Sequence, residues 1–263
     1  MMNDELKGRT ALVTGASSGM GVDYARELAR RGANLILVAR RRDALERVAK
    51  EMRDHHGVEV RVTPADLSDA SDRERLFREL EAEGSQVDML LNNAGFGLFG
   101  KFAESDWERV NQMLQIDIVA LSHLTRLFTL GMIARRWGRI LLIASTAAFQ
   151  PVPIYAAYGA AKSYVLSLGV ALNHELRGTG VSCTVACPGV TATEFFQVAG
   201  QRQTLYQRMT IMPSAKVAEI ALKALLAKRP VIVAGGLNAF MALSTRLMPR
   251  TWAAALGYQL MKN

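Results

Sequence analysis

The sequence Thr14-Gly15-Ala16-Ser17-Ser18-Gly19-Met20-Gly21 decides the fold of this chain. It follows a short apolar run at residues 10–14 and precedes residues spaced as in an amphipathic helix. Glycine permits positive φ angles and close approach to the main chain, and the first N–H groups of a helix attract phosphate. A strand, a glycine-rich turn and a helix in this order therefore predict a dinucleotide-binding turn. Its spacing is G-x-x-x-G-x-G and not the more familiar G-x-G-x-x-G.

Outward from this turn, short apolar runs alternate with longer helical patterns, which predicts βαβ units and a parallel sheet. Runs such as residues 34–39 are apolar throughout, as expected of strands covered on both faces. The predicted fold class is α/β: a doubly wound Rossmann fold with a seven-stranded, mainly parallel sheet flanked by helices. The strands are expected at residues 10–14, 34–39, 58–63, 87–92, 139–145, 181–186 and 231–234.

The length of 263 residues and the 50% hydrophobic content favour a single globular unit. We expect residues 1–235 to form the dinucleotide-binding and catalytic domain, with residues 236–263 as its apolar, basic helical extension. The N-terminus lacks the apolar core of a secretory signal, and no run of 18 uncharged apolar residues indicates a conventional spanning helix. A cytoplasmic location is therefore the expectation.

Two cysteines and four histidines offer no metal-ligand spacing, so no metal site is predicted. Cys183 and Cys187 lie on one predicted strand, roughly 13 Å apart by strand rise, which is too far for a disulfide. They are interpreted as core or turn residues.

The formal net charge of +8 is concentrated in the last quarter of the chain, where residues 195–263 carry nine Lys and Arg against only Glu219. Such asymmetry favours an anionic neighbour: a phosphate ligand, an acidic protein or a lipid surface. The alternative is a basic surface that only aids solubility. No nucleic-acid partner is expected.

The end of the second predicted strand bears on the cofactor, because an acidic residue there accepts the ribose hydroxyls of NAD. Here the strand runs into Arg40-Arg41-Arg42 without an acid. A guanidinium can bind a 2′-phosphate with two hydrogen bonds. The sequence thus favours NADP(H) over NAD(H), with Arg40 as the contact and Arg42 as a solvated charge at a helix entry.

A possible catalytic set follows the fifth predicted strand. Ser145 ends that strand, and Tyr158 and Lys162 stand at i and i+4 in a helical segment, which puts both side chains on one face. Carbonyl reduction by hydride transfer needs a proton donor at the developing alkoxide. Tyrosine suits this role when a nearby cation stabilises its phenolate, and a serine hydroxyl can hydrogen-bond the substrate oxygen.

Together these motifs resemble the short-chain dehydrogenases/reductases over about residues 7–235. The resemblance rests on T-G-x-x-x-G-x-G at 14–21, N-N-A-G at 92–95, Ser145, Y-x-x-x-K at 158–162, and Pro188-Gly189 followed by Thr193. It implies that Tyr158 is the general acid/base, that Lys162 also holds the nicotinamide ribose, and that homodimers or homotetramers form. The cofactor-binding residues implied or expected are Gly15, Ser17, Ser18, Gly19, Met20, Gly21, Arg40, Asp66, Leu67, Asn93, Ala94, Gly95, Tyr158, Lys162, Pro188, Gly189, Val190 and Thr193.

One position departs from the family pattern. Members usually carry an Asn in the helix before the fifth strand, where it supports a water relay to the Lys, and the matching residue here is Asp117. Asp117 is still expected to serve the catalytic set through its backbone carbonyl. Its carboxylate is expected to alter the coupled titration of Tyr158 and Lys162.

The substrate pocket is expected beneath a loop of about 25 residues after Pro188-Gly189, because long loops beside a cofactor are commonly active-site lids. Apolar residues there indicate a small hydrophobic carbonyl or alcohol, unless they only pack the lid onto the fold. The expected pocket residues are Phe96, Phe149, Val152, Tyr155, Phe195 and Phe196, and the lid also contains Leu205, Tyr206 and Met209.

Residues 236–263 read as two short apolar helices broken by Pro249, with three basic residues and no acid. They are expected to cover the substrate mouth, to form a subunit contact, or to lie peripherally at a membrane interface.

The predicted function is that of an NADP(H)-dependent oxidoreductase interconverting a secondary alcohol and a ketone or aldehyde. The favoured direction is reduction of a hydrophobic carbonyl, with Tyr158 as general acid. One alternative is a 3-oxoacyl-thioester reductase with an acidic acyl carrier protein as partner. Another is a non-catalytic NADP(H)-binding regulator, against which the complete set of Ser145, Tyr158 and Lys162 argues.

Overall fold

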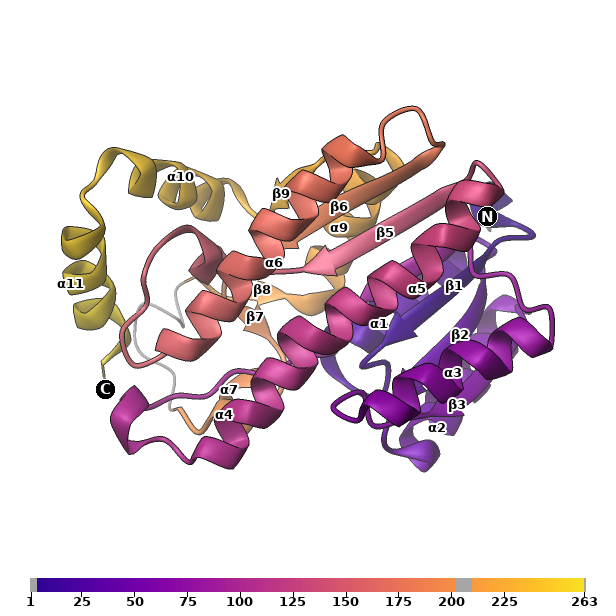
Figure 1. The fold of residues 1–263 in the computed structure, drawn as a ribbon, viewed down its shortest axis with the longest axis horizontal. Helices are drawn as coiled ribbons and strands as arrows, with labels where there is room; N and C mark the ends of the chain where they lie inside the picture. The colour runs from indigo at the N-terminus through magenta and orange to yellow at the C-terminus, as the bar shows by residue number, and fades with distance from the viewer. Residues whose placement is uncertain (1–3, 202–209, 263) are drawn as a thin grey trace.

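The computed structural model of the protein describes residues 4–201 and 210–262. Within these residues, seven strands form one parallel sheet in the order β3-β2-β1-β4-β5-β6-β9. Figure 1 shows this sheet and labels each of its strands except β4. The strands are β1 (Thr10–Thr14), β2 (Asn34–Ala39), β3 (Val60–Pro64), β4 (Met89–Asn92), β5 (Gly138–Ile143), β6 (Val181–Cys187) and β9 (Val231–Val233). The strand order reverses between β1 and β4, and such a reversal opens a ligand crevice at the carboxyl ends of the strands. The predicted doubly wound fold is confirmed.

Helices cover both faces of the sheet (Figure 1). One layer holds α1 (Gly19–Arg30), α2 (Arg42–His56) and α9 (Ser214–Leu226), and the other holds α3 (Ala70–Ala82), α4 (Trp107–Leu114), α5 (Leu121–Ala134) and α6 (Ala156–Glu175). Strand β2 explains why the strands are apolar throughout: Leu35 and Leu37 pack into one core, and Ile36 and Val38 pack into the other.

Strand β5 ends earlier than predicted, at Ile143, so Ser145 lies just beyond the sheet. The reason is local, because the Ser145 Oγ accepts a hydrogen bond from the Ala147 N–H at 3.1 Å and caps a 3₁₀ turn, η4 (Thr146–Phe149). The two cysteines are free and buried in β6, as their spacing predicted.

The segment after β6 is more structured than the predicted loop. Two-residue strands β7 (Thr191–Ala192) and β8 (Met212–Pro213) pair in parallel, and a short helix α7 (Phe195–Ala199) lies between them in sequence. The predicted lid residues Leu205, Tyr206 and Met209 fall outside the described residues. The remaining short elements are the 3₁₀ turns η1 (Asp4–Leu6) and η2 (Phe102–Glu104).

A single long helical stretch runs from Trp107 to Ala134, through α4, the π-helical turn η3 (Gln115–Ala120) and α5. By length and composition alone it is apolar enough to cross a membrane, although it contains the charged residues Glu108, Arg109, Asp117 and Arg126. In the fold α5 contacts β4 and β5, and η3 contacts α6. The stretch therefore covers one face of the sheet.

The C-terminal extension comprises α10 (Gly236–Ser244), the 3₁₀ turn η5 (Thr245–Leu247) and α11 (Arg250–Met261), which starts after Pro249 as predicted. In Figure 1 it forms the edge of the molecule opposite the N-terminus. The Thr245 hydroxyl donates to the Phe149 carbonyl at 3.3 Å, and Gly257 packs over Pro151. The extension thus lies across the segment that follows Ser145.

Candidate active site

The glycine turn between β1 and α1 has the predicted positive φ angles. Gly15 and Gly19 have φ angles of +67° and +55°, which glycine adopts without steric cost. Gly21 does not line the cleft, contrary to its predicted role as a cofactor contact. A Cβ at Gly21 would lie 2.2 Å from the Gly15 carbonyl oxygen. The absence of a side chain at Gly21 therefore lets the first turn of α1 pack closely against the glycine turn.

A cleft of about 470 Å³ lies at this turn, at the carboxyl ends of β1, β2, β3 and β4. The Ser18 side chain makes no capping hydrogen bond within the described chain, which leaves the first N–H groups of α1 available to an anion. The predicted cofactor residues that line this cleft are Gly15, Ser17, Ser18, Gly19, Met20, Arg40, Asp66, Leu67, Asn93, Ala94, Gly95 and Thr193.

Two of the three arginines that follow β2 lie at the cleft. Arg40 and Arg41 both line it, and Arg41 Nη2 donates to the Ser17 hydroxyl at 3.4 Å. Arg42 does not line it, because α2 begins at that residue. Sequence reasoning identified Arg40 but missed Arg41. It also missed Arg109, whose guanidinium lies 5.1 Å from the Phe96 ring centroid at the same cleft.

The N-N-A-G segment after β4 is tied to β1. The Thr14 hydroxyl accepts hydrogen bonds from the backbone N–H groups of Asn93 and Ala94, at 3.0 and 2.9 Å. The Asn93 amide donates back to the Thr14 carbonyl at 2.9 Å. These bonds hold the segment beside the glycine turn, where a Cβ at Gly15 would lie 2.9 Å from the Ala94 Cα.

Tyr158 and Lys162 come from the first turns of α6 and face the same cavity, as the i, i+4 spacing predicted. The Lys162 Nζ lies 5.6 Å from the Tyr158 ring centroid and donates to the Ile143 carbonyl at 3.1 Å. Ser145, two residues beyond β5, lines the same cavity, and its hydroxyl acts to lower the pKa of Tyr158. The three predicted catalytic side chains therefore meet at one point.

Asp117 lies behind Lys162 and lines neither cavity. Its Oδ2 is 3.0 Å from the Lys162 Nζ, and its Oδ1 accepts a hydrogen bond from the Phe96 N–H at 3.1 Å. Both charged groups are buried, the Asp117 side chain fully. The carboxylate sits in the π-helical turn η3, a distortion that often marks functional sites. Sequence reasoning expected a role for the backbone carbonyl of Asp117 and an effect of its carboxylate on the titration of Tyr158 and Lys162. The structure places that carboxylate in direct contact with Lys162.

The charges of this cluster favour a protonated tyrosine beside a cationic lysine. Burial raises the pKa of Tyr158, and Lys162 and Ser145 only partly offset that rise. Burial alone would lower the pKa of Lys162, but attraction to Asp117 and Tyr158 outweighs it and the pKa is raised. Burial also raises the pKa of Asp117 against the opposing effect of Lys162. The arrangement can donate a proton from the Tyr158 hydroxyl.

A second cavity, of about 250 Å³, opens from Ser145, Tyr158 and Lys162. Five of the six predicted pocket residues line it: Phe96, Val152, Tyr155, Phe195 and Phe196, together with Pro188, Gly189 and Val190 from the predicted cofactor set. Phe149 does not, because its ring packs against the core under α6 and the following residue, Gln150, reaches the cavity instead.

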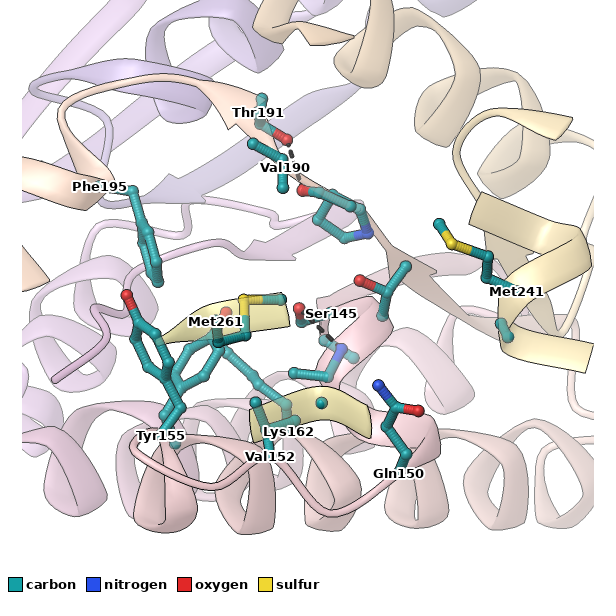
Figure 2. A pocket seen from close by; sticks show the side chains of 18 of the residues that line it. Ser145, Gln150, Val152, Tyr155, Lys162, Val190, Thr191, Phe195, Met241 and Met261 are labelled. Carbon is teal, nitrogen blue, oxygen red and sulfur yellow. Dashed lines mark hydrogen bonds between the residues drawn. The ribbon is translucent and has the colours of Figure 1, made fainter. Parts of the chain in front are cut away.

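The C-terminal extension supplies a wall that sequence reasoning left open among three roles. Met241 and Met261 line the cavity, as Figure 2 shows, with Ser145 between the end at Tyr155 and Phe195 and the end at Gln150 and Met241. The other lining residues from the extension are Ala242, Ser244, Thr245, Met248, Leu256 and Gly257. Only the apolar, acid-free composition of this segment hinted at such a role.

Gln201 links the C-terminal extension to the start of α6 through two hydrogen bonds. The Tyr155 hydroxyl donates to the Gln201 Oε1 at 2.6 Å, and the Gln201 Nε2 donates to the Met261 carbonyl at 2.9 Å. Tyr155 is thereby held as a wall of the cavity. For residues 4–201 and 210–262, the structure places no group of three or more His, Cys, Asp or Glu side chains where they could hold a metal ion.

Comparison with known proteins agrees with this geometry. A family model described as "short chain dehydrogenase" matches residues 9–204. The chain is 33% identical over 199 residues to a very-long-chain 3-oxoacyl-CoA reductase of Anas platyrhynchos, a match that covers 73% of this chain and 62% of that protein.

Solved structures of similar proteins contain either nicotinamide cofactor. A short-chain dehydrogenase from Sphingobium yanoikuyae in complex with NADPH superposes with a TM-score of 0.83 at 32% identity, covering 91% of this chain and 93% of that one. A short-chain dehydrogenase/reductase from Burkholderia phymatum in complex with NAD gives a TM-score of 0.82 at 26% identity, over 91% and 93% of the two chains.

Proposed function

The chain belongs to the short-chain dehydrogenase/reductase family of nicotinamide-dependent oxidoreductases that act on CH–OH groups, and from this premise we propose that it reduces hydrophobic ketones or aldehydes with NADPH. The observation that carries the proposal is the meeting of Ser145, Tyr158 and Lys162 at the base of an apolar cavity. A non-catalytic binder of NADP(H) has no need of all three side chains in this arrangement.

The residues divide the chemistry among them. A bound nicotinamide supplies the hydride. The Ser145 hydroxyl hydrogen-bonds the substrate oxygen, and Tyr158 donates its proton to that oxygen as negative charge develops. Lys162 stabilises the phenolate that remains, and its own charge is held by Asp117, 3.0 Å away.

The residues at the cleft fit a nicotinamide dinucleotide. The open N–H groups of α1 and the glycine turn suit a pyrophosphate. Arg40 and Arg41 stand where a 2′-phosphate would need positive charge, and no acidic residue follows β2 directly. These two arginines support the preference for NADP(H).

Replacing Arg40 with Asp is expected to weaken NADPH binding by roughly 10- to 100-fold and NADH binding much less, because a charge-assisted hydrogen bond to the 2′-phosphate is lost. Fluorescence titration with each cofactor measures the two dissociation constants. The matched control is Arg42→Asp, an equal change in charge at a residue that does not line the cleft. Equal weakening of NADPH and NADH by Arg40→Asp would contradict the assignment.

Substrate class is tested by a homologous series of methyl ketones, followed as NADPH oxidation. Each added methylene that is buried in the cavity is expected to raise kcat/KM by about fourfold, until the cavity of about 250 Å³ is filled. A steroid ketone and a 3-oxoacyl thioester extend the panel to bulkier substrates. A flat series, with short polar ketones reduced as fast as long ones, would overturn the hydrophobic-substrate proposal.

A 3-oxoacyl thioester is the second candidate substrate, favoured by the similarity to the 3-oxoacyl-CoA reductase and by the basic last quarter of the chain. An acidic carrier protein or a nucleotide-bearing thioester would suit that charge. Preference for the thioester over a ketone of the same chain length, lost at high salt, would decide in favour of this candidate.

A further inference from the structure

Large apolar side chains lie on the outer face of the C-terminal extension. Leu237, Phe240, Leu243 and Leu247 follow one another at intervals of three or four residues and are 60%, 69%, 61% and 89% exposed. Trp252 and Leu256 continue the apolar surface on α11, at 69% and 51% exposed. The inner face is made by small buried residues, Ala242 and Ala253. We call the six exposed side chains the outer apolar face.

The charge beside this face has one sign. Arg246, Arg250 and Lys262 are exposed, and no Asp or Glu occurs in the sequence after Glu219. Apolar and aromatic side chains joined to basic residues are typical of helices that lie in a membrane interface. A second copy of the chain, paired face to face across a two-fold axis, would instead bring these like charges together.

The outer apolar face continues into the substrate cavity. Leu256 is half exposed and also lines the cavity, and Met248 lies on the same connection between α10 and α11 and lines it too. The extension is therefore both an apolar surface and a wall of the pocket, so a lipid-soluble ligand at that surface would stand beside the pocket.

We propose that the outer apolar face binds peripherally to an anionic lipid bilayer, with its leucines and aromatic residues in the interface and Arg246 and Arg250 at the headgroups. Binding of the bilayer does not depend on the reaction proposed above. A benefit of docking for delivery of the substrate does rest on that proposed function.

The test is sedimentation of the full-length protein with sucrose-loaded vesicles of phosphatidylcholine, with or without phosphatidylglycerol. We expect binding to the anionic vesicles that weakens as salt is added, because salt screens exposed charges. Arg246→Gln with Arg250→Gln should lower the partition coefficient about fivefold for each charge removed. Leu243→Ser with Leu247→Ser should lower it at least about tenfold, because apolar area is no longer buried.

Leu130→Ser is the matched control, since Leu130 is 59% exposed on α5, away from the extension. It should leave vesicle binding unchanged, and affinity for NADPH checks that every variant is folded. Absence of binding to anionic vesicles would overturn the proposal, and so would an equal loss in Leu130→Ser. Loss of self-association in the Leu243→Ser, Leu247→Ser variant, with vesicle binding intact, would assign the face to a second copy instead.

Discussion

Replacing Tyr158 with Phe is expected to lower kcat/KM for carbonyl reduction by roughly 10²- to 10⁴-fold, the usual contribution of a positioned proton donor. The phenol lines the cavity beside Ser145 and Lys162, and the Lys162 Nζ lies 5.6 Å from its ring centroid. Removing only its oxygen leaves the ring, the cavity wall and the cleft in place. The dissociation constant for NADPH should therefore change by less than about threefold. Steady-state kinetics and cofactor titration measure the two quantities separately.

Tyr155 provides the matched control for this variant. Its ring lies 5.9 Å from the Tyr158 ring, centroid to centroid, and it lines the same cavity. Its hydroxyl, however, donates a hydrogen bond to Gln201. Burial raises the pKa of Tyr155, and the residue one helical turn later is Gly159, which has no charge to oppose that rise. Tyr155→Phe should retain activity within about tenfold. An active Tyr158→Phe paired with an inactive Tyr155→Phe would reverse the assignment of the proton donor.

The parts of the site that the sequence predicted are those encoded by local spacing. The glycine turn, the N-N-A-G segment and the Tyr158–Lys162 pair each lie within eight residues of chain. Their geometry follows from the turn or helix that contains them, and the parallel sheet brings the ends of their strands to one edge. No long-range packing information is needed to place such residues together.

Sequence reasoning missed Arg41 and wrongly placed Phe149 in the pocket. The direction of both side chains depends on the residue at which a neighbouring helix or turn begins or ends. Sequence reasoning favoured Arg40 as the contact and Arg42 as solvated, and only the start of α2 at Arg42 shows that Arg41 lines the cleft as well. In the same way, the 3₁₀ turn after Ser145 decides that Gln150 and not Phe149 reaches the cavity. A shift of one residue changes the direction of a side chain, and periodicity does not fix the boundary of an element so closely.

The wall made by α10 and α11 shows a different limit. Met241 and Met261 are distant in sequence from every motif, and they reach the cavity because the extension docks over the segment that follows β5. Docking of this kind is tertiary packing, which leaves no periodic pattern or fixed spacing in the sequence. Two-residue strands such as β7 and β8 are likewise too short to have a pattern.

Removing the carboxylate of Asp117 is expected to destabilise the fold more than most single substitutions. Asp117→Ala leaves the Lys162 ammonium, 7% exposed, without its ion-pair partner, and deprives the Phe96 N–H of its acceptor. Breaking a buried pair by removing one partner costs about 3–5 kcal/mol in the free energy of unfolding. Urea denaturation measures this loss. In the double variant Asp117→Leu, Lys162→Met most of the stability should return, because no buried charge is left unpaired, whereas activity should not.

Asp117→Asn separates the charge of this residue from its shape. The amide oxygen can still accept the Phe96 N–H, so the variant is expected to fold and remain active. Loss of the negative charge lowers the pKa of Tyr158 and removes one of the interactions that raise the pKa of Lys162. Reduction requires a protonated Tyr158 beside a charged Lys162, and both changes deplete that state as pH rises. The alkaline limb of kcat/KM should therefore move to lower pH, reporting the pair and not either residue alone. An unmoved limb would mean that Asp117 carries no charge that acts on Tyr158 and Lys162 in the native enzyme, and a limb moved to higher pH would contradict the assigned effect of its carboxylate.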